Sequence, residues 1–112
     1  MRGDSSVDAH FEAAGDGTAR LRGEITFRSV GPLLLAGGEA IEAGRADAID
    51  LAGVTAADSA GLALLIEWLS LARRAGRTLS YRNVPAQIRQ LAGLSDVQNL
   101  VLPAGSAAAP PR

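Results

Sequence analysis

The longest helical pattern in this chain runs from Asp58 to Gly76, and any fold must be built around it. Alanine and leucine dominate the segment and no proline interrupts it, so helix propensity agrees with the pattern. Asp58 or Ser59 can serve as the N-cap, because either side chain can accept hydrogen bonds from the free N–H groups of the first turn. At the other end, Gly76 can adopt the left-handed conformation that often ends a helix. The segment is therefore predicted to be an α-helix.

Apolar side chains cover more than one side of this predicted helix. At about 100° per residue, one stripe has the i, i+3, i+4, i+7 spacing of a face that covers a sheet, and it consists of Leu62, Leu65, Ile66, Leu69 and Ala72. A second stripe lies beside it and consists of Leu64, Trp68, Leu71 and Ala75. Either a neighbouring helix or another protein covers this second stripe. Burial of each of its large side chains would contribute about 1.5–3 kcal/mol before entropic costs, which is enough to anchor a partner.

Strand and helix patterns alternate along the rest of the chain. A β-hairpin is predicted over residues 10–23, because Ala19 and Leu21 alternate with arginines after the turn signal Asp16-Gly17. A weak or broken helix is predicted over residues 32–42, since each glycine of Gly37-Gly38 costs about 1 kcal/mol against alanine. The remaining predicted elements are a strand at 47–53 that residues 54–57 join to the central helix, a strand at 78–82, a helix at 85–92 ended by Gly93, and an edge strand at 99–102.

This order of elements predicts an α/β fold with a small mixed, mainly parallel sheet. Alternating strands and helices form parallel pairs, and the first hairpin adds an antiparallel one. The 112 residues fit one domain. The expected boundaries are a flexible leader at 1–8, the domain at 9–102, and a disordered tail rich in Ala, Pro and Gly at 103–112.

Composition narrows the classes of function. The net charge of −1 argues against a duplex DNA binder, which needs a basic face. The chain has no cysteine and one histidine, His10, so neither a metal site nor a cofactor is expected. The start of the chain lacks an apolar signal segment, and the longest apolar run, Leu62 to Ile66, is too short to span a bilayer. We expect a cytoplasmic protein that reaches a membrane only through a partner.

The start of the central helix carries the candidate site residues. Asp58 has no second acid at fixed spacing and no histidine partner, so capping is its favoured role and no enzymatic activity is predicted. A Gly-x-x-x-x-Gly-Lys phosphate loop is absent, which argues against nucleotide hydrolysis. Ser59 is either a plain cap or an exposed hydroxyl at a helix start, where free N–H groups favour oxygen ligands or phosphate. Gly61 would allow close approach to a strand or a partner.

The residues Asp50-Leu51 on a strand, followed by residues 58–65 opening a helix, resemble the signature of STAS domains. STAS domains form the fold of anti-sigma factor antagonists and of sulfate-transporter tails. The resemblance is greatest to the MlaB type, the STAS subunit of the bacterial ABC system that moves phospholipids between membranes. It covers residues 9–103. The matching segments are residues 58–76, Gly23-Glu24 with Leu33-Leu34, and residues 88–94 ahead of Val101-Leu102-Pro103.

The MlaB type implies a non-enzymatic subunit that docks on the cytoplasmic ATPase of the ABC transporter. It would support phospholipid transport and outer-membrane lipid asymmetry, and it would be held at the inner membrane through this partner. Together with the wide apolar arc, the resemblance implies a partner-binding face made of Asp58, Ser59, Ala60, Gly61, Leu64, Trp68 and Leu71.

The same resemblance implies an alternative function for Ser59. In the wider family, the hydroxyl residue after the motif aspartate is a phosphoryl acceptor or a contact residue, and that position is Ser59 here. MlaB-type proteins commonly have Thr there followed by Gly, whereas this chain has Ser59 and Ala60. The alternative is therefore an anti-sigma factor antagonist that is regulated when an anti-sigma kinase phosphorylates Ser59.

Overall fold

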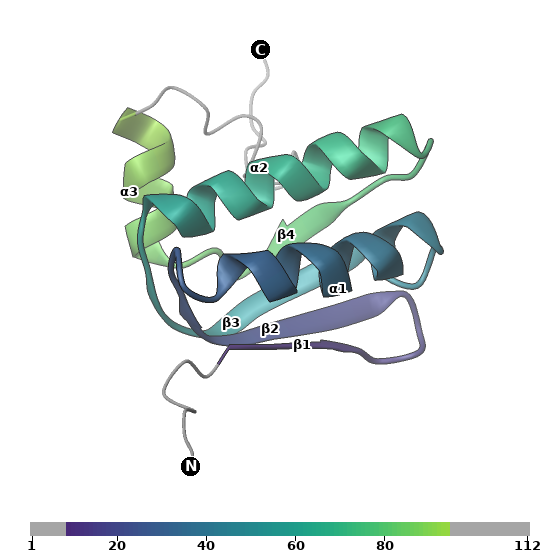
Figure 1. The fold of residues 1–112 in the computed structure, drawn as a ribbon, viewed down its shortest axis with the longest axis horizontal. Coiled ribbons are helices and arrows are strands. Elements are labelled where there is room, and N and C mark those ends of the chain that lie inside the picture. The colour runs from purple at the N-terminus through teal and green to yellow at the C-terminus, as the bar shows by residue number, and fades with distance from the viewer. Residues whose placement is uncertain (1–8, 95–112) are drawn as a thin grey trace.

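The computed structural model describes residues 9–94, which form four strands and three helices (Figure 1). The strands are β1 (His10–Ala13), β2 (Thr18–Ile25), β3 (Ala48–Ala57) and β4 (Ser80–Arg82). The helices are α1 (Val30–Glu42), α2 (Ser59–Arg74) and α3 (Ala86–Leu94). The leader, edge strand and tail predicted at 1–8, 99–102 and 103–112 lie outside the described residues.

The strands form one mixed sheet in the order β1-β2-β3-β4. β1 and β2 are antiparallel, while β2 with β3 and β3 with β4 are parallel. At the hairpin turn, the Asp16 carboxylate accepts hydrogen bonds from the backbone N–H and the hydroxyl of Thr18. These bonds lower the pKa of Asp16, because they favour its charged form. The predicted α/β fold with a mainly parallel sheet is confirmed.

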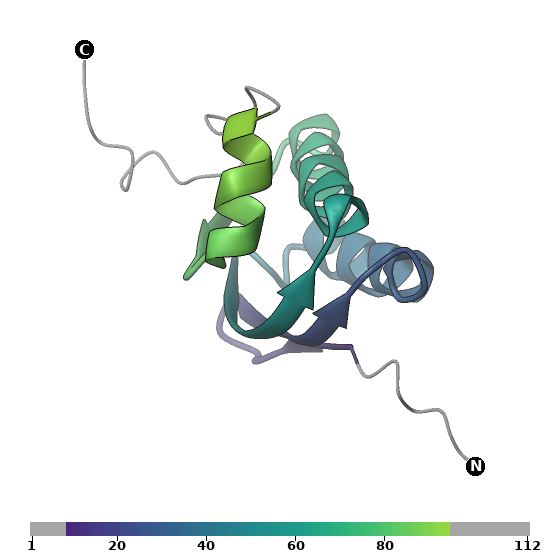
Figure 2. The same cartoon turned by 90° about the vertical axis from the view of Figure 1, so that its left-hand side faces the viewer.

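All three helices lie on one face of the sheet (Figures 1 and 2). Viewed from the end, they stand side by side in the order α1, α2, α3, and α2 packs against both neighbours (Figure 2). Among residues 9–94, no element covers the other face of the sheet. Within the same residues, no helix has the length and apolar character needed to cross a membrane.

Helix α1 is unbroken, which corrects the expectation of a weak or broken helix at Gly37-Gly38. Both glycines are buried where α1 meets α2, and a Cβ at Gly37 would overlap the indole ring of Trp68. The two glycines cost about 2 kcal/mol in helix propensity. Burial of an aromatic side chain removes about 150–250 Å² from water at about 25 cal/mol per Å², and this gain exceeds that cost.

Other element boundaries differ from the predictions by a few residues. β3 continues to Ala57 rather than ending at residue 53, because residues 54–57 pair with β2 up to Ile25. α3 runs through Gly93, which does not adopt a positive φ and so does not end the helix. Gly76 has φ +71°, which confirms it as the left-handed residue after α2.

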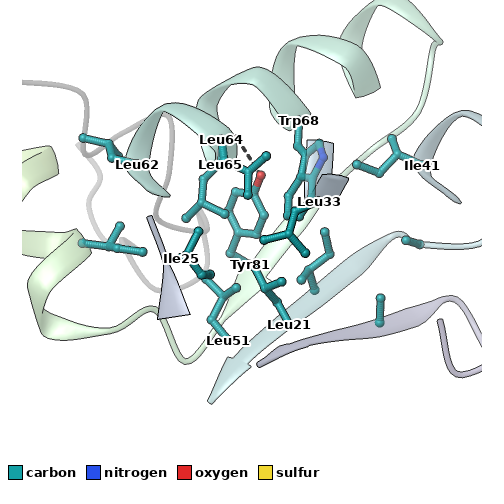
Figure 3. Close-up of a cluster of buried hydrophobic side chains, with 14 of the residues drawn as sticks. Leu21, Ile25, Leu33, Ile41, Leu51, Leu62, Leu64, Leu65, Trp68 and Tyr81 are labelled. Atoms are coloured by element: carbon teal, nitrogen blue, oxygen red, sulfur yellow. Dashed lines mark hydrogen bonds between the residues drawn. The ribbon is translucent and has the colours of Figure 1, made fainter. Parts of the chain in front are cut away.

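Two of the large side chains in the second apolar stripe of α2, Leu64 and Trp68, are buried within the domain. Trp68 is fully buried, its ring centroid lies 5.6 Å from that of Phe11, and its indole N–H donates to the Leu34 carbonyl at 3.4 Å. Leu64 is 3% exposed and Leu71 is half-buried. Trp68 points from α2 into the buried cluster between helix and sheet (Figure 3). Of the two covers that the sequence allowed, the neighbouring helix α1 is the one that lies over Trp68, so Trp68 is not the exposed contact that was expected. Leu64 is also buried, whereas Leu71 keeps partial exposure and Ala75 is exposed.

Replacing Gly37 with alanine is expected to destabilise the domain by about 1–3 kcal/mol, because the new methyl group would overlap the buried Trp68 ring. Gly31→Ala is the matched control on the same helix, since a Cβ there meets nothing within 4 Å. Its stability should stay unchanged or rise by up to about 1 kcal/mol. Urea unfolding followed by circular dichroism measures both variants. Equal stability of the two would contradict close packing of Trp68 on α1.

Tyr81 is expected to make the domain less stable at alkaline pH. Its side chain is 1% exposed, its hydroxyl donates to the Leu65 carbonyl (Figure 3), and burial raises the pKa of Tyr81 well above 10.0. The unfolded chain therefore loses the tyrosine proton at a lower pH than the folded chain. The free energy of unfolding should fall as pH rises above about 10, by at most about 1.4 kcal/mol per pH unit.

Tyr81→Phe isolates this effect, because the chain has no other tyrosine, no cysteine and no lysine. The variant should show no fall in unfolding free energy between about pH 9 and about pH 11, where tyrosine titrates. Urea titrations at both pH values measure the difference. A parallel fall in the unchanged protein and the variant would show that another group is responsible.

Candidate functional site

The predicted residues at the start of α2 lie at one end of the molecule. α1 follows β2 and α2 follows β3, and because these strands are parallel, both helices start at the same edge of the sheet (Figure 2). The Asp58 N–H donates to the Ile25 carbonyl at 3.3 Å, which joins the start of α2 to the end of β2. Residues 58–61 and the β2–α1 connection, residues 26–29, therefore belong to one end of the domain.

Asp58 is the N-cap of α2. Its backbone is extended, and its Oδ1 accepts a hydrogen bond from the Ala60 N–H at 2.9 Å. From the sequence, either Asp58 or Ser59 could be the N-cap, and the structure shows that it is Asp58. The carboxylate thus stabilises the helix start, as the sequence favoured over a catalytic role.

Ser59 is the first residue of α2, and its side chain is exposed. Because Asp58 provides the cap, the helix start does not depend on the Ser59 hydroxyl. Gly61, two residues on, is buried, and a Cβ there would lie 3.1 Å from the carbonyl oxygen of Ile25. The predicted close approach of helix to strand at Gly61 is confirmed, and it holds Ser59 beside the end of β2.

A groove of about 330 Å³ lies between the first turns of α1 and α2. Its lining is mainly apolar and consists of Val30, Gly31, Leu34, Ala60, Ala63, Leu64 and Glu67. Leu64 thus reaches the groove from the second stripe, whereas Trp68 and Leu71 are not among its lining residues. The sequence analysis missed this groove, because its two walls are far apart in the chain and are joined only by the fold.

Phe27 is the second feature that the sequence analysis missed. It lies in the β2–α1 connection and is 74% exposed. The connection is held by the buried Ser29, whose hydroxyl donates to the Glu24 carbonyl at 2.9 Å and accepts from the Thr26 N–H at 3.1 Å. The sequence signal that could have predicted this exposed ring is a single aromatic residue in the connection between a predicted strand and a predicted helix. The ring is therefore presented to solvent from a well-tied backbone.

Asp50, the strand residue of the STAS-like signature, lies away from the groove. Its neighbours Ile49 and Leu51 are buried under the helices, so the alternation of the strand places Asp50 on the opposite face of the sheet. Hydrogen bonds from the Asn83 side chain and the Ala52 N–H, each 2.9 Å, lower the pKa of Asp50 by favouring its charged form. Asp50 therefore connects β3 to the segment after β4.

The side chains around the groove are mainly apolar. Glu67 is the charged residue in the groove lining, and its Oε2 lies 3.6 Å from the Nη2 of Arg74. The Glu67 side chain is 49% exposed and the Arg74 side chain 61%. Among residues 9–94, no three histidine, aspartate or glutamate side chains gather as a metal-ion site requires. An open apolar groove beside an exposed hydroxyl and an exposed aromatic ring is typical of a protein interaction site.

The solved structures that are similar to this fold include two forms of one protein. One is the phosphorylated form of SpoIIAA, a Bacillus cell fate determinant, with a TM-score of 0.62 and 17% identity over 84% of this chain and 88% of that chain. The other is the unphosphorylated form of the anti-sigma factor antagonist SpoIIAA, with a TM-score of 0.60 and 18% identity over 77% and 82%. At these identities the likeness concerns the fold alone. No match was found among curated proteins.

The family comparison covers nearly the whole domain. Residues 10–103 match the family described as "Mlab, STAS domain". The matched region includes all four strands, the three helices and the start of α2 at Asp58 and Ser59. This agrees with the resemblance found in the sequence, which covers residues 9–103. The chain therefore belongs to the MlaB-type STAS-domain family.

Proposed function

We propose that this protein is a non-enzymatic STAS subunit that binds and supports the cytoplasmic ATPase of an ABC transporter for phospholipids. The observation that carries the proposal is the open apolar groove beside the exposed Ser59 in a MlaB-type STAS domain. Family membership supports the class of partner, and the groove supports the position of the contact. The protein would work in the cytoplasm without a cofactor, held at the inner membrane through the ATPase.

The docking surface that we propose differs from the one expected from the sequence. It consists of the groove lining together with Ser59 (Ser59, Ala60, Ala63, Leu64 and Glu67 of α2 with Val30, Gly31 and Leu34 of α1). Trp68 is fully buried and would support binding indirectly, by holding α1 against α2. Its substitution would therefore test the stability of the domain rather than a contact with the ATPase.

Ala63→Arg is expected to lower the affinity for the ATPase by at least about tenfold, since a charged side chain would occupy an apolar groove that the partner has to enter. Ala63 is exposed on α2, and arginine is a good helix former, so the fold should be retained. Ala36→Arg is the matched control, because Ala36 is exposed on α1 and is not among the groove-lining residues. Co-expression and co-purification with the ATPase measure binding, and thermal melting checks folding.

Two results would contradict different parts of this proposal. Full binding by a folded Ala63→Arg variant would contradict the groove as the docking surface. Failure of the unchanged protein to bind the ATPase at all would contradict the function itself. Equal loss in Ala63→Arg and Ala36→Arg would indicate a general effect of added charge and would also count against the groove.

The second candidate function is an anti-sigma factor antagonist that is switched by phosphorylation of Ser59. The observation in its favour is the exposed hydroxyl at a helix start that is already capped by Asp58. Backbone N–H groups at such a position favour phosphate. Against it, the Asp58 carboxylate already binds the Ala60 N–H, and it would repel a phosphate attached to the next residue.

Phosphorylation of Ser59 distinguishes the two functions. If the second candidate is right, incubation with an anti-sigma kinase and ATP should add one phosphoryl group to the unchanged protein and none to Ser59→Ala. Intact-mass spectrometry measures this addition. An unmodified protein under conditions in which the kinase modifies its own antagonist would contradict the switch. Modification that also abolishes partner binding would support it.

A further inference from the structure

We infer that Phe27 and Glu67 determine the kind of segment that the groove accepts, namely an amphipathic helix of the ATPase. The apolar side of this helix would enter the groove, a basic side chain would lie over Glu67, and an apolar pocket beside it would receive the Phe27 ring. The identity of the partner rests on the proposed function, whereas the chemistry of its contact is argued from the residues around the groove.

Two large apolar side chains are exposed just before and within α1, the helix that forms one wall of the groove. Among residues 9–94, the large apolar side chains that are mostly exposed are Phe27 at 74% and Leu35 at 71%. Phe27 lies in the connection three residues before Val30 of the groove lining, and Leu35 follows Leu34 of the lining directly in α1. Both exposed side chains are thus next in the chain to the residues that form the α1 wall of the groove.

Phe27 has the properties of an interface anchor. The Ser29 hydroxyl ties the backbone on both sides of the ring, through the Glu24 carbonyl and the Thr26 N–H. A backbone that is already held in place loses less conformational freedom when a partner binds, and aromatic residues are enriched at binding hot spots. A phenyl ring left in water gains the full benefit of apolar burial when a partner covers it.

The lining of the groove favours a helix over an extended peptide. All the lining residues belong to α1 and α2, whose backbone groups are largely paired within the helices, so an extended peptide would find no free strand edge there. From Ala60 to Glu67 the groove wall runs about 10 Å along α2 at 1.5 Å per residue, the length of about two helical turns. An amphipathic helix with apolar residues at i, i+3 or i+4, and i+7 matches that length.

Glu67 sets the charge that this helix should carry. It is the charged residue of the lining, and its ion pair with Arg74 at 3.6 Å joins two side chains that are 49% and 61% exposed. An exposed pair of this kind is weak, so a basic side chain from a partner can share or replace Arg74. The groove is thus complementary to a segment with an apolar stripe and one basic residue beside it.

Phe27→Ala is expected to weaken binding of the purified ATPase about 30-fold or more, the loss typical of a hot-spot aromatic residue. The melting temperature should not change, because the Phe27 side chain is mostly exposed in the free protein. Isothermal titration calorimetry of the full chain with the ATPase measures the affinity. Equal affinities of Phe27→Ala and the unchanged protein would overturn this inference while the proposed function stands, whereas no binding by the unchanged protein would overturn both.

Glu67→Arg provides an independent test of the charge. It should weaken ATPase binding at least about tenfold and reduce the dependence of binding on salt. Glu42→Arg is the matched control, since Glu42 is the exposed last residue of α1 and positive charge there suits the helix dipole. If Glu67→Arg binds the ATPase with unchanged affinity, the inference that the partner places a basic side chain over Glu67 is wrong.

A lipid is the other occupant that an apolar groove could take. Co-sedimentation with vesicles of phosphatidylethanolamine and phosphatidylglycerol tests whether the groove binds lipid instead of a helix of the ATPase. Vesicle binding that Phe27→Ala abolishes, together with ATPase binding that it leaves unchanged, would overturn the helix as occupant. If Phe27→Ala loses ATPase binding and the unchanged protein does not bind vesicles, the result supports a helix of the ATPase as the occupant.

Discussion

The contact between Trp68 and Gly37 of α1 is the interaction on which the rest of this structure depends. Because Gly37 has no side chain, the indole ring lies directly against α1, and its N–H donates to the Leu34 carbonyl. The contact holds α1 against α2 and buries Trp68, for which the sequence had not identified the covering element. It also determines which apolar surface stays open, because the groove lies before Trp68 on α2 and before Gly37 on α1.

Small residues have opposite effects at the two ends of this helix pair. At Gly37 and Gly38 the absent side chains are replaced by Trp68 and Leu71 from α2, which gives close packing. Near the start of the helices, a Cβ at Gly31 would meet nothing within 4 Å, and Gly31 and Ala63 line the open groove. The same kind of residue thus makes both the rigid part of the helix layer and its proposed docking surface.

Local signals made part of this fold and site predictable from the sequence. The ends of α2, the hairpin at Asp16-Gly17 and the roles of Asp58 and Gly61 follow from capping, turn and spacing rules within a few residues. The continuity of α1 was not predictable, because it depends on Trp68 from a distant segment overriding the propensity of Gly37. The groove and the exposed ring of Phe27 were missed for a related reason, since the exposure of an apolar residue depends on which elements become its neighbours.

The use of Asp58 as cap links the two candidate functions at Ser59. Since the cap leaves the Ser59 hydroxyl exposed, a partner can contact it as a neutral group at the rim of the groove. Phosphorylation would place a charge of about −1.5 to −2 at the same rim, beside the Asp58 carboxylate and near an apolar surface. An apolar helix that enters the groove would have to desolvate part of that charge, which is unfavourable. If this surface docks an apolar helix as proposed, a phosphoryl group on Ser59 would therefore oppose that docking, so the two proposed uses of Ser59 would exclude each other.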